Sequence, residues 1–169
     1  MGKILGSWSG MRKYLEEEMI ADSLKERIRY SCTSYVGMHG CHIFEIRMDG
    51  ETFKRFSLET VNTYFINNGF TERKNHYGTA EYWSEFWTLL DKYAITARTE
   101  YTDEEFCNAI NLYRNQDIRD SIYSKNPLVR MFAISDRRIG KRTLYELNAE
   151  ELPEWLRTLY NLRISAECN

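Results

Sequence analysis

The sequence predicts an α+β fold, and three patterns support this prediction. Over residues 27–56, apolar and polar side chains alternate with a period of two, which is typical of half-buried strands. From residue 57 onward, the apolar positions recur at helical spacing instead. A further helical pattern precedes the strands. We therefore expect an N-terminal helix, a small three-stranded antiparallel sheet and a helical C-terminal majority.

Length and composition fit one packed domain. The chain has 169 residues, of which 43% are hydrophobic and 14% are aromatic. A chain of this size normally builds a single core, and no low-complexity linker interrupts it. We expect a single domain over residues 1–169, with a helix and β-meander lobe over 1–56 and a helical lobe over 57–169.

The first helix is expected to begin at an N-cap, Ser9, and to end near Lys25. Its apolar stripe repeats every four residues and consists of Met11, Leu15 and Met19. This spacing keeps the three side chains on one face, which we expect to contact the core.

Three strands are expected over residues 27–36, 41–48 and 51–56. In the first strand, the residues that face one side are Ile28, Tyr30 and Cys32. The pair Asp49-Gly50 strongly favours a two-residue hairpin between the second and third strands. The strands therefore form an antiparallel meander.

The next two helices are expected to begin at Ser57 and at Thr79, which are good N-cap residues. The first of them ends at the sequence Asn67-Asn68-Gly69. The second has apolar positions that cover about 160° of its circumference, which is wider than an ordinary amphipathic stripe. These positions are Tyr82, Trp83, Phe86, Trp87, Leu89, Leu90 and Tyr93. We expect this helix to lie at the centre of the core.

The C-terminal helices have clear start signals. Thr102 and Glu105 form a capping box, and a short helix is expected over 117–123. Asn126-Pro127 starts another helix, since proline suits the first helical position. The last helix is expected to begin near Pro153.

Charge and the cysteines indicate a compartment. The formal net charge is −2, so the chain has no overall attraction for nucleic acid. No apolar run approaches the roughly 18 residues of a membrane span, and the N-terminus lacks the apolar core of a secretory signal. The four cysteines contain no CxxC pair, which is typical of idle thiols in a reducing cytosol. We expect a cytoplasmic protein with no membrane contact.

The strongest candidate binding site is a basic cluster near the C-terminus. It consists of Arg137, Arg138, Lys141 and Arg142, and Arg130 would extend it. Two interpretations remain open. The cluster is either a helix junction, in which Gly140 ends a helix and the charges pair with Glu16, Glu17, Glu150 or Glu151, or a site for an anion or a partner.

Metal binding and catalysis have weaker signals. Cys32, His39, Cys41 and His42 are the only metal-ligand set, but their spacing matches no familiar zinc pattern. The sequence therefore predicts no metal and no cofactor. His76 is a loop histidine, and the chain contains no GxSxG, HExxH or phosphate-binding glycine loop. We expect no catalytic residue, and an enzyme with a site around His76 or His39 remains an alternative.

Three blocks of the sequence carry a resemblance to a known family. They are WSGMRKYLEEEM near the N-terminus, DRRIGKRTL at 136–144 and LPEWLRTLYNLRISAE at 152–167. The chain resembles a family of small uncharacterised bacterial proteins, first named from an enterobacterial genome project. The resemblance implies a bacterial protein that is similar to this family over nearly its whole length, and it implies no catalytic residue.

A second likeness concerns NPLVRMFAISD at 126–136, which is similar to the opening of a HEAT-type helical repeat. The chain contains one copy, and a solenoid needs about three stacked units to bury its core. We therefore do not expect a repeat array.

These observations favour a non-enzymatic interaction module. We expect it to bind a macromolecular partner, most plausibly a protein, through the basic cluster. A nucleic-acid binder that uses the same cluster is the alternative.

Overall fold

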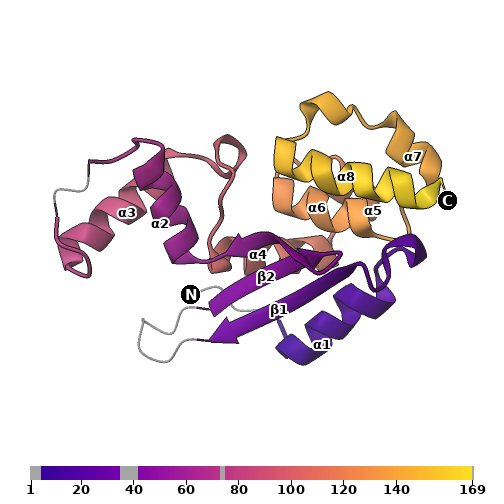
Figure 1. Cartoon of the computed structure of the whole chain (residues 1–169), viewed down its shortest axis with the longest axis horizontal. Coiled ribbons are helices and arrows are strands. Elements are labelled where there is room, and N and C mark those ends of the chain that lie inside the picture. The colour runs from indigo at the N-terminus through magenta and orange to yellow at the C-terminus, as the bar shows by residue number, and fades with distance from the viewer. Residues whose placement is uncertain (1–4, 35–41, 73–74, 169) are drawn as a thin grey trace.

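The chain folds as the predicted α+β arrangement, seen in a computed structural model that describes residues 5–34, 42–72 and 75–168 (Figure 1). A short N-terminal helix precedes a three-stranded antiparallel sheet, and helices make up most of the remaining chain. In Figure 1, α4 lies behind the sheet, α5–α8 form a layer at one end, and α2 and α3 lie at the other end.

The N-terminal helix starts earlier and ends sooner than the sequence predicts. α1 spans Trp8–Lys13, and its N-cap is Ser7, whose hydroxyl accepts a hydrogen bond from the Gly10 amide at 3.1 Å. The N-cap prediction at Ser9 is therefore wrong. A π-helical turn over Tyr14–Glu18 and a 3-10 turn over Asp22–Leu24 follow.

The helix cannot continue to Lys25 because its backbone is used elsewhere. Residues 19–21 run antiparallel to residues 135–137, where Ile20 and Asp136 form a β-bridge. The Ala21 amide donates to the Ser135 carbonyl at 2.8 Å, and the Arg137 amide donates to the Met19 carbonyl at 2.8 Å. These hydrogen bonds join the N-terminal segment to the end of α6.

The sheet is the predicted meander. β1 spans Ile28–Ser34, β2 spans His42–Met48 and β3 spans Glu51–Phe56, in the order β1-β2-β3. The hairpin between β2 and β3 turns at Asp49 and Gly50, whose φ angles of 51° and 88° are those of the tight turn that the pair favours. The buried side chains of one face are Ile28, Tyr30, Phe44, Ile46 and Phe56.

The main core is centred on α6, which spans Pro127–Ser135 and buries every side chain except that of Arg130. α4 spans Asp103–Asn115 and begins with the predicted capping box of Thr102 and Glu105. Its Phe106 ring stacks on Phe56 from the sheet at 4.5 Å between centroids. On its other side, Phe106 contacts Phe132 of α6 at 5.7 Å. This aromatic column joins the sheet to the helices.

Three further helices complete this layer. α5 spans Ile118–Ile122, α7 spans Lys141–Glu146 and α8 spans Glu154–Glu167. Short 3-10 turns at Ile95–Ala97 and Ala149–Glu151 lie before α4 and α8. The predicted starts of α5, α6 and α8 agree with their N-caps, which are Asp117, Asn126 and Pro153.

α2 and α3 build a second, smaller cluster. α2 spans Leu58–Asn67 and α3 spans Ala80–Lys92, and their N-caps are Ser57 and Thr79, as predicted. The buried members of the cluster are Val61, Phe65, Phe86 and Leu89. The expectation that this second helix lies at the centre of the core is wrong, because the wide apolar arc of α3 faces α2 and leaves Trp87 42% exposed.

A buried lysine fastens the sheet to the segment that follows α3. The Lys54 side chain of β3 is 5% exposed, and its ammonium donates to the Thr99 carbonyl and to Glu100 Oε1, the latter at 2.8 Å. It lies over the adjoining rings of Tyr101 and Trp155, at 5.5 and 5.3 Å from their centroids. Ring faces attract cations, so this position offsets part of the cost of burial.

We expect replacement of Lys54 to be strongly destabilising. Lys54→Ala removes the ion pair with Glu100, both ring contacts and the packing of the lysine stem. The free energy of unfolding should fall by about 3 kcal/mol, as is typical when one partner of a buried pair is lost. Lys54→Met keeps the stem and should cost less than Lys54→Ala. Urea denaturation measures both, and equal stability of all three proteins would contradict this role.

Alkaline pH provides a second test of the same lysine. Burial lowers the pKa of Lys54 below its ordinary value of 10.5. The unfolded chain therefore binds this proton more tightly, and the contribution of Lys54 to stability should rise as the pH increases from its folded pKa towards 10.5. The wild-type protein should gain stability relative to Lys54→Met in that range. A difference that is constant or shrinks with pH would refute the lowered pKa.

Candidate functional site

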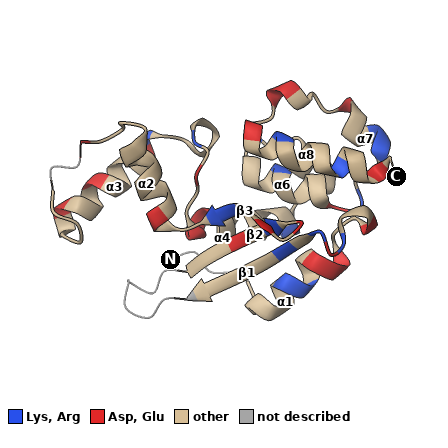
Figure 2. Cartoon of the chain, in the orientation of Figure 1, with Lys and Arg blue, Asp and Glu red and all other residues tan. Residues whose placement is uncertain are grey.

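The basic cluster lies on the segment that joins α6 to α7, near the C-terminus of the chain (Figure 2). The sequence suggested that Gly140 ends a helix, and this prediction is wrong. Gly140 is the N-cap of α7, with an ordinary φ of −82°. Lys141 and Arg142 therefore occupy the first turn of α7, while Arg137 and Arg138 follow the end of α6.

Arg138 is part of a buried network around Asp136. Asp136 is fully buried and accepts hydrogen bonds from the Arg138 guanidinium, at 2.6 Å from Nη2, and from the Tyr113 hydroxyl of α4. The Arg138 amide also donates to Asp136, at 2.7 Å. The carboxylate beside it raises the pKa of Arg138, and burial raises the pKa of Tyr113. Arg138 therefore neutralises a buried charge of the same molecule.

A buried arginine from α8 completes this junction. Arg163 of α8 is 3% exposed and donates to the Ser135 and Ile139 carbonyls at 3.3 and 3.1 Å. Its Nε lies 3.0 Å from Glu167. Arg163 was not predicted as a site residue, although the sequence carries one signal for it. It continues the apolar stripe of α8 at helical spacing, after Leu156, Leu159 and Tyr160.

Three cations of the cluster remain at the surface, and we call Arg137, Lys141 and Arg142 the α7 patch. Arg142 pairs with Glu146 one turn later at 2.9 Å, but its side chain is 93% exposed, and such pairs contribute little. Within the described chain, the side chains of Arg137 and Lys141 form no hydrogen bond or ion pair. The predicted pairing with Glu16, Glu17, Glu150 or Glu151 is not seen among these residues.

Helix stability does not explain the α7 patch. Lys141 and Arg142 lie at the start of α7, where the positive end of the helix dipole disfavours cations. Neither residue is near a buried carboxylate comparable to Asp136. The α7 patch is therefore the part of the cluster whose positive charge faces solvent.

Arg130 does not join the α7 patch. It lies in the first half of α6, whereas Arg137 follows the end of that helix, and its charged neighbours are Glu151 and Tyr123. Its Nε is buried and has no hydrogen-bond partner in the described structure, and burial lowers the pKa of its guanidinium. A ligand cannot reach an atom that water does not reach, so this Nε offers no open site.

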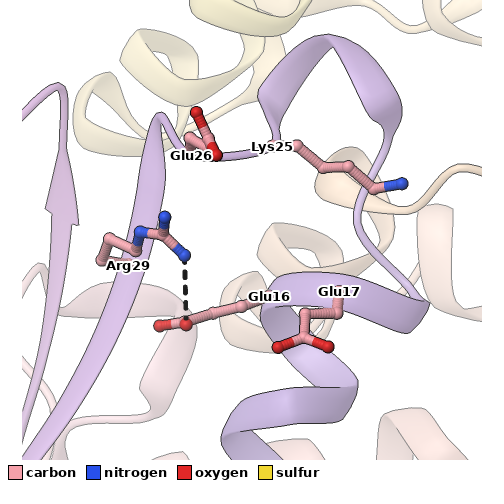
Figure 3. Close-up of a pocket in the computed structure, with 5 residues that line it drawn as sticks. All are labelled: Glu16, Glu17, Lys25, Glu26 and Arg29. Carbon is pink, nitrogen blue, oxygen red and sulfur yellow. Dashed lines mark hydrogen bonds and ion pairs between the residues drawn. The ribbon is translucent and has the colours of Figure 1, made fainter.

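A depression lies between the π-helical turn over Tyr14–Glu18, the segment that precedes β1, and β1 itself, with a volume of about 550 Å³ (Figure 3). It is lined by Glu16, Glu17, Lys25, Glu26 and Arg29. Glu16 is already engaged, since it accepts from the Tyr30 amide at 2.7 Å and from Arg29 at 3.4 Å. The lining mixes carboxylates with cations and contains no thiol, hydroxyl or imidazole.

No metal site is formed by the histidines and cysteines that the structure describes. His76 lies on an exposed loop, and His39 and Cys41 lie outside the part of the chain that the structure describes. Among the described residues, no group of three metal-ligand side chains lies close enough to hold an ion. Burial raises the pKa of the Cys107 thiol to about 12 and also raises that of Cys32, so both remain protonated at neutral pH.

No helix in the described part of the chain is long and apolar enough to cross a membrane.

Comparison with known proteins gives one match. The model of the SF0329 protein family, which is uncharacterised, matches residues 7–164. No curated protein and no solved structure matches the chain.

The different roles of neighbouring arginines can be tested by stability. Arg138→Ala leaves the buried carboxylate of Asp136 without its charge partner, and we expect a loss of about 3 kcal/mol in the free energy of unfolding. Arg142→Ala removes only an exposed pair and should cost at most about 0.5 kcal/mol. Thermal and urea denaturation of both variants provide the comparison. Similar losses in the two variants would show that the Asp136 network has no special role.

Proposed function

The chain belongs to the SF0329 protein family, and we propose that it is a non-enzymatic interaction module that binds an acidic surface of a partner protein through the α7 patch. The observation that carries the proposal is the exposure of three cations, Arg137, Lys141 and Arg142, within six residues. Among them, only Arg142 forms an ion pair within the described chain, and that pair is itself exposed. Arg138, their neighbour, has a structural role and is not part of the proposed surface.

The chemistry of the α7 patch suits carboxylates. A guanidinium presents parallel N–H donors that match a carboxylate, and an ammonium adds a point charge. Tyr145 of the same helix is 58% exposed, and tyrosine and arginine are the residue types that contribute most often to protein interfaces. Its hydroxyl lies 3.3 Å from Cys168 Sγ, a contact that links α7 to the end of α8.

A protein partner is favoured over nucleic acid. Three cations would neutralise about three phosphates, and binding of nucleic acid depends on many such contacts. The net charge of −2 adds no long-range attraction. A protein surface with two or three carboxylates needs no larger patch.

The surroundings of His76, which lies on an exposed loop, support a non-enzymatic role. A general base needs an oriented partner, and among the described residues no carboxylate forms a hydrogen bond with the His76 ring. The depression beside α1 offers charges but no nucleophile.

The proposal also includes a bacterial origin and a cytoplasmic location. The resemblance of three sequence blocks to small bacterial proteins supports a bacterial origin. Cys32, Cys107 and Cys168 are free thiols, which fits the reducing environment of the cytoplasm.

Charge reversal tests the α7 patch directly. We expect Arg137→Glu, Lys141→Glu and Arg142→Glu, combined in one variant, to weaken binding of a 20-residue polyglutamate probe by at least about tenfold, because each attraction becomes a repulsion. A control variant reverses three exposed cations elsewhere, Lys92, Arg119 and Lys125. Fluorescence anisotropy at low salt measures both affinities.

Two outcomes would contradict the proposal. One is equal binding of polyglutamate by the wild-type protein and the reversed variant, with a far-ultraviolet circular dichroism spectrum that shows both to be folded. The other is tighter binding of a 20-nucleotide single strand than of polyglutamate, with an affinity that falls steeply as salt increases. That result would favour the nucleic-acid alternative.

A further inference from the structure

A second basic surface lies on the face of the sheet opposite the core. Its exposed residues, which we call the arginine face, are Arg29, Ser31, Thr33, Arg47 and Arg55. The helices of the main core pack on the other face, through Tyr30, Phe44 and Phe56. Basic segments on β1 and β3 are visible in Figure 2. The arginine face does not include any residue of the α7 patch.

The register places two like charges directly opposite each other, because Arg29 of β1 pairs with Arg47 of β2. Next to them, Glu45 of β2 pairs with Arg55 of β3, which has the opposite charge. Two cations that face each other across a strand pair repel and destabilise the sheet. A sheet shaped for stability alone would place an acid at one of these positions, so the arrangement points to a use for the positive charge.

Two carboxylates hold the three guanidinium groups in place. Glu45, which is 8% exposed, accepts from Arg47 Nε at 2.7 Å and from Arg55 Nη2 at 2.8 Å. Glu16 accepts from Arg29 at 3.4 Å, the contact drawn in Figure 3. One positive charge is left over, and each arginine side chain remains more than half exposed, at 52%, 55% and 54% for Arg29, Arg47 and Arg55.

This arrangement fixes the arginines before any ligand arrives. Arg47 uses Nε to bind Glu45, so both of its Nη groups remain available, and Arg55 keeps Nη1. Side chains that are already ordered lose less conformational entropy when they bind a ligand. The carboxylates of Glu45 and Glu16 therefore act as supports for a set of outward-facing donors.

We propose that the arginine face binds an extended acidic segment of a partner protein that crosses the three strands. Neighbouring strands lie about 4.8 Å apart, and the diagonal from Arg47 to Arg55 spans about 7 Å. Alternate side chains of an extended peptide point to the same side and lie about 7 Å apart. Aspartate or glutamate at every second position would thus match the spacing of Arg47 and Arg55, and Arg29 lies directly opposite Arg47 on the neighbouring strand.

The same face suits nucleic acid less well. Single strands bind proteins largely by stacking their bases on aromatic rings. The described exposed residues of the arginine face carry guanidinium and hydroxyl groups and no ring. An acidic peptide needs only the carboxylate-binding donors that this face presents.

A defined probe tests the arginine face. We would use a fluorescent ten-residue peptide of alternating glutamate and threonine, with a glutamine and threonine peptide as its neutral control. Arg29→Gln, Arg47→Gln and Arg55→Gln combined should weaken binding at least tenfold. A charge-matched control with Lys92→Gln, Arg119→Gln and Lys125→Gln should bind within twofold of wild type. The variant with Arg137→Gln, Lys141→Gln and Arg142→Gln should lose less affinity than the arginine-face variant, and this difference separates the proposal from that of the α7 patch.

A milder variant and a mapping experiment guard against loss of folding. Arg47→Lys with Arg55→Lys keeps the charges and loses the forked donors, so binding should be intermediate.

Amide chemical shifts of the wild-type protein should change on β1–β3 when peptide is added. Unchanged affinity in the folded Arg→Gln variant, or shifts confined to α7, would overturn the proposal. Tighter binding of a ten-nucleotide thymidine strand would overturn it in favour of nucleic acid.

Discussion

The fold depends on one buried carboxylate, Asp136. A carboxylate without solvent is tolerated only when its charge and its lone pairs are satisfied, and here Tyr113 and Arg138 satisfy them. The backbone on either side of Asp136 pairs with residues 19–21, and Arg163 binds the carbonyls of Ser135 and Ile139. The N-terminal segment, α4, α6 and α8 therefore meet at one point. The contacts hold residues 135–139 in place, and α7 begins directly after this segment, at Lys141.

This junction explains why four neighbouring cations have different roles. Arg138 is drawn inward because it follows Asp136 by two residues and their side chains can meet. The Arg137 backbone amide donates to the Met19 carbonyl of the N-terminal segment, and its side chain is exposed. Lys141 and Arg142 lie beyond Gly140 on the first turn of a new helix. The cluster thus contains one arginine with a structural role and three cations that face solvent.

Local signals in the sequence were sufficient for much of the fold. The hairpin pair Asp49-Gly50, the caps at Ser57 and Thr79 and the capping box at Thr102 each depend on residues within four positions, and each is found where it was expected. Features that depend on distant contacts were missed.

The missed features share this cause. The width of the apolar arc on α3 suggested that this helix lies at the centre of the core. The shorter helix α6 has that position instead, because the burial of a helix depends on which elements surround it. The burial of Arg163 likewise follows from the path of the chain that brings α8 against Ser135 and Ile139. For the arginine face, the alternation of β1 and β2 was readable, but the pairing of Arg29 with Arg47 requires the register.

The parallel bridge between Phe56 and Tyr101 separates α2 and α3 from the rest of the fold. The Ser57 amide donates to the Tyr101 carbonyl at 3.3 Å, so the polypeptide leaves the body and returns to it at nearly the same point. Everything between, including α2 and α3 with their own aromatic cluster, is an excursion from a continuous framework. Such an excursion can lengthen, shorten or diversify without redirecting the strands or the helices around Asp136. Changes in chain length should therefore be tolerated best between residues 58 and 92, because Thr99 and Glu100 bind Lys54 and Arg98 binds Glu105.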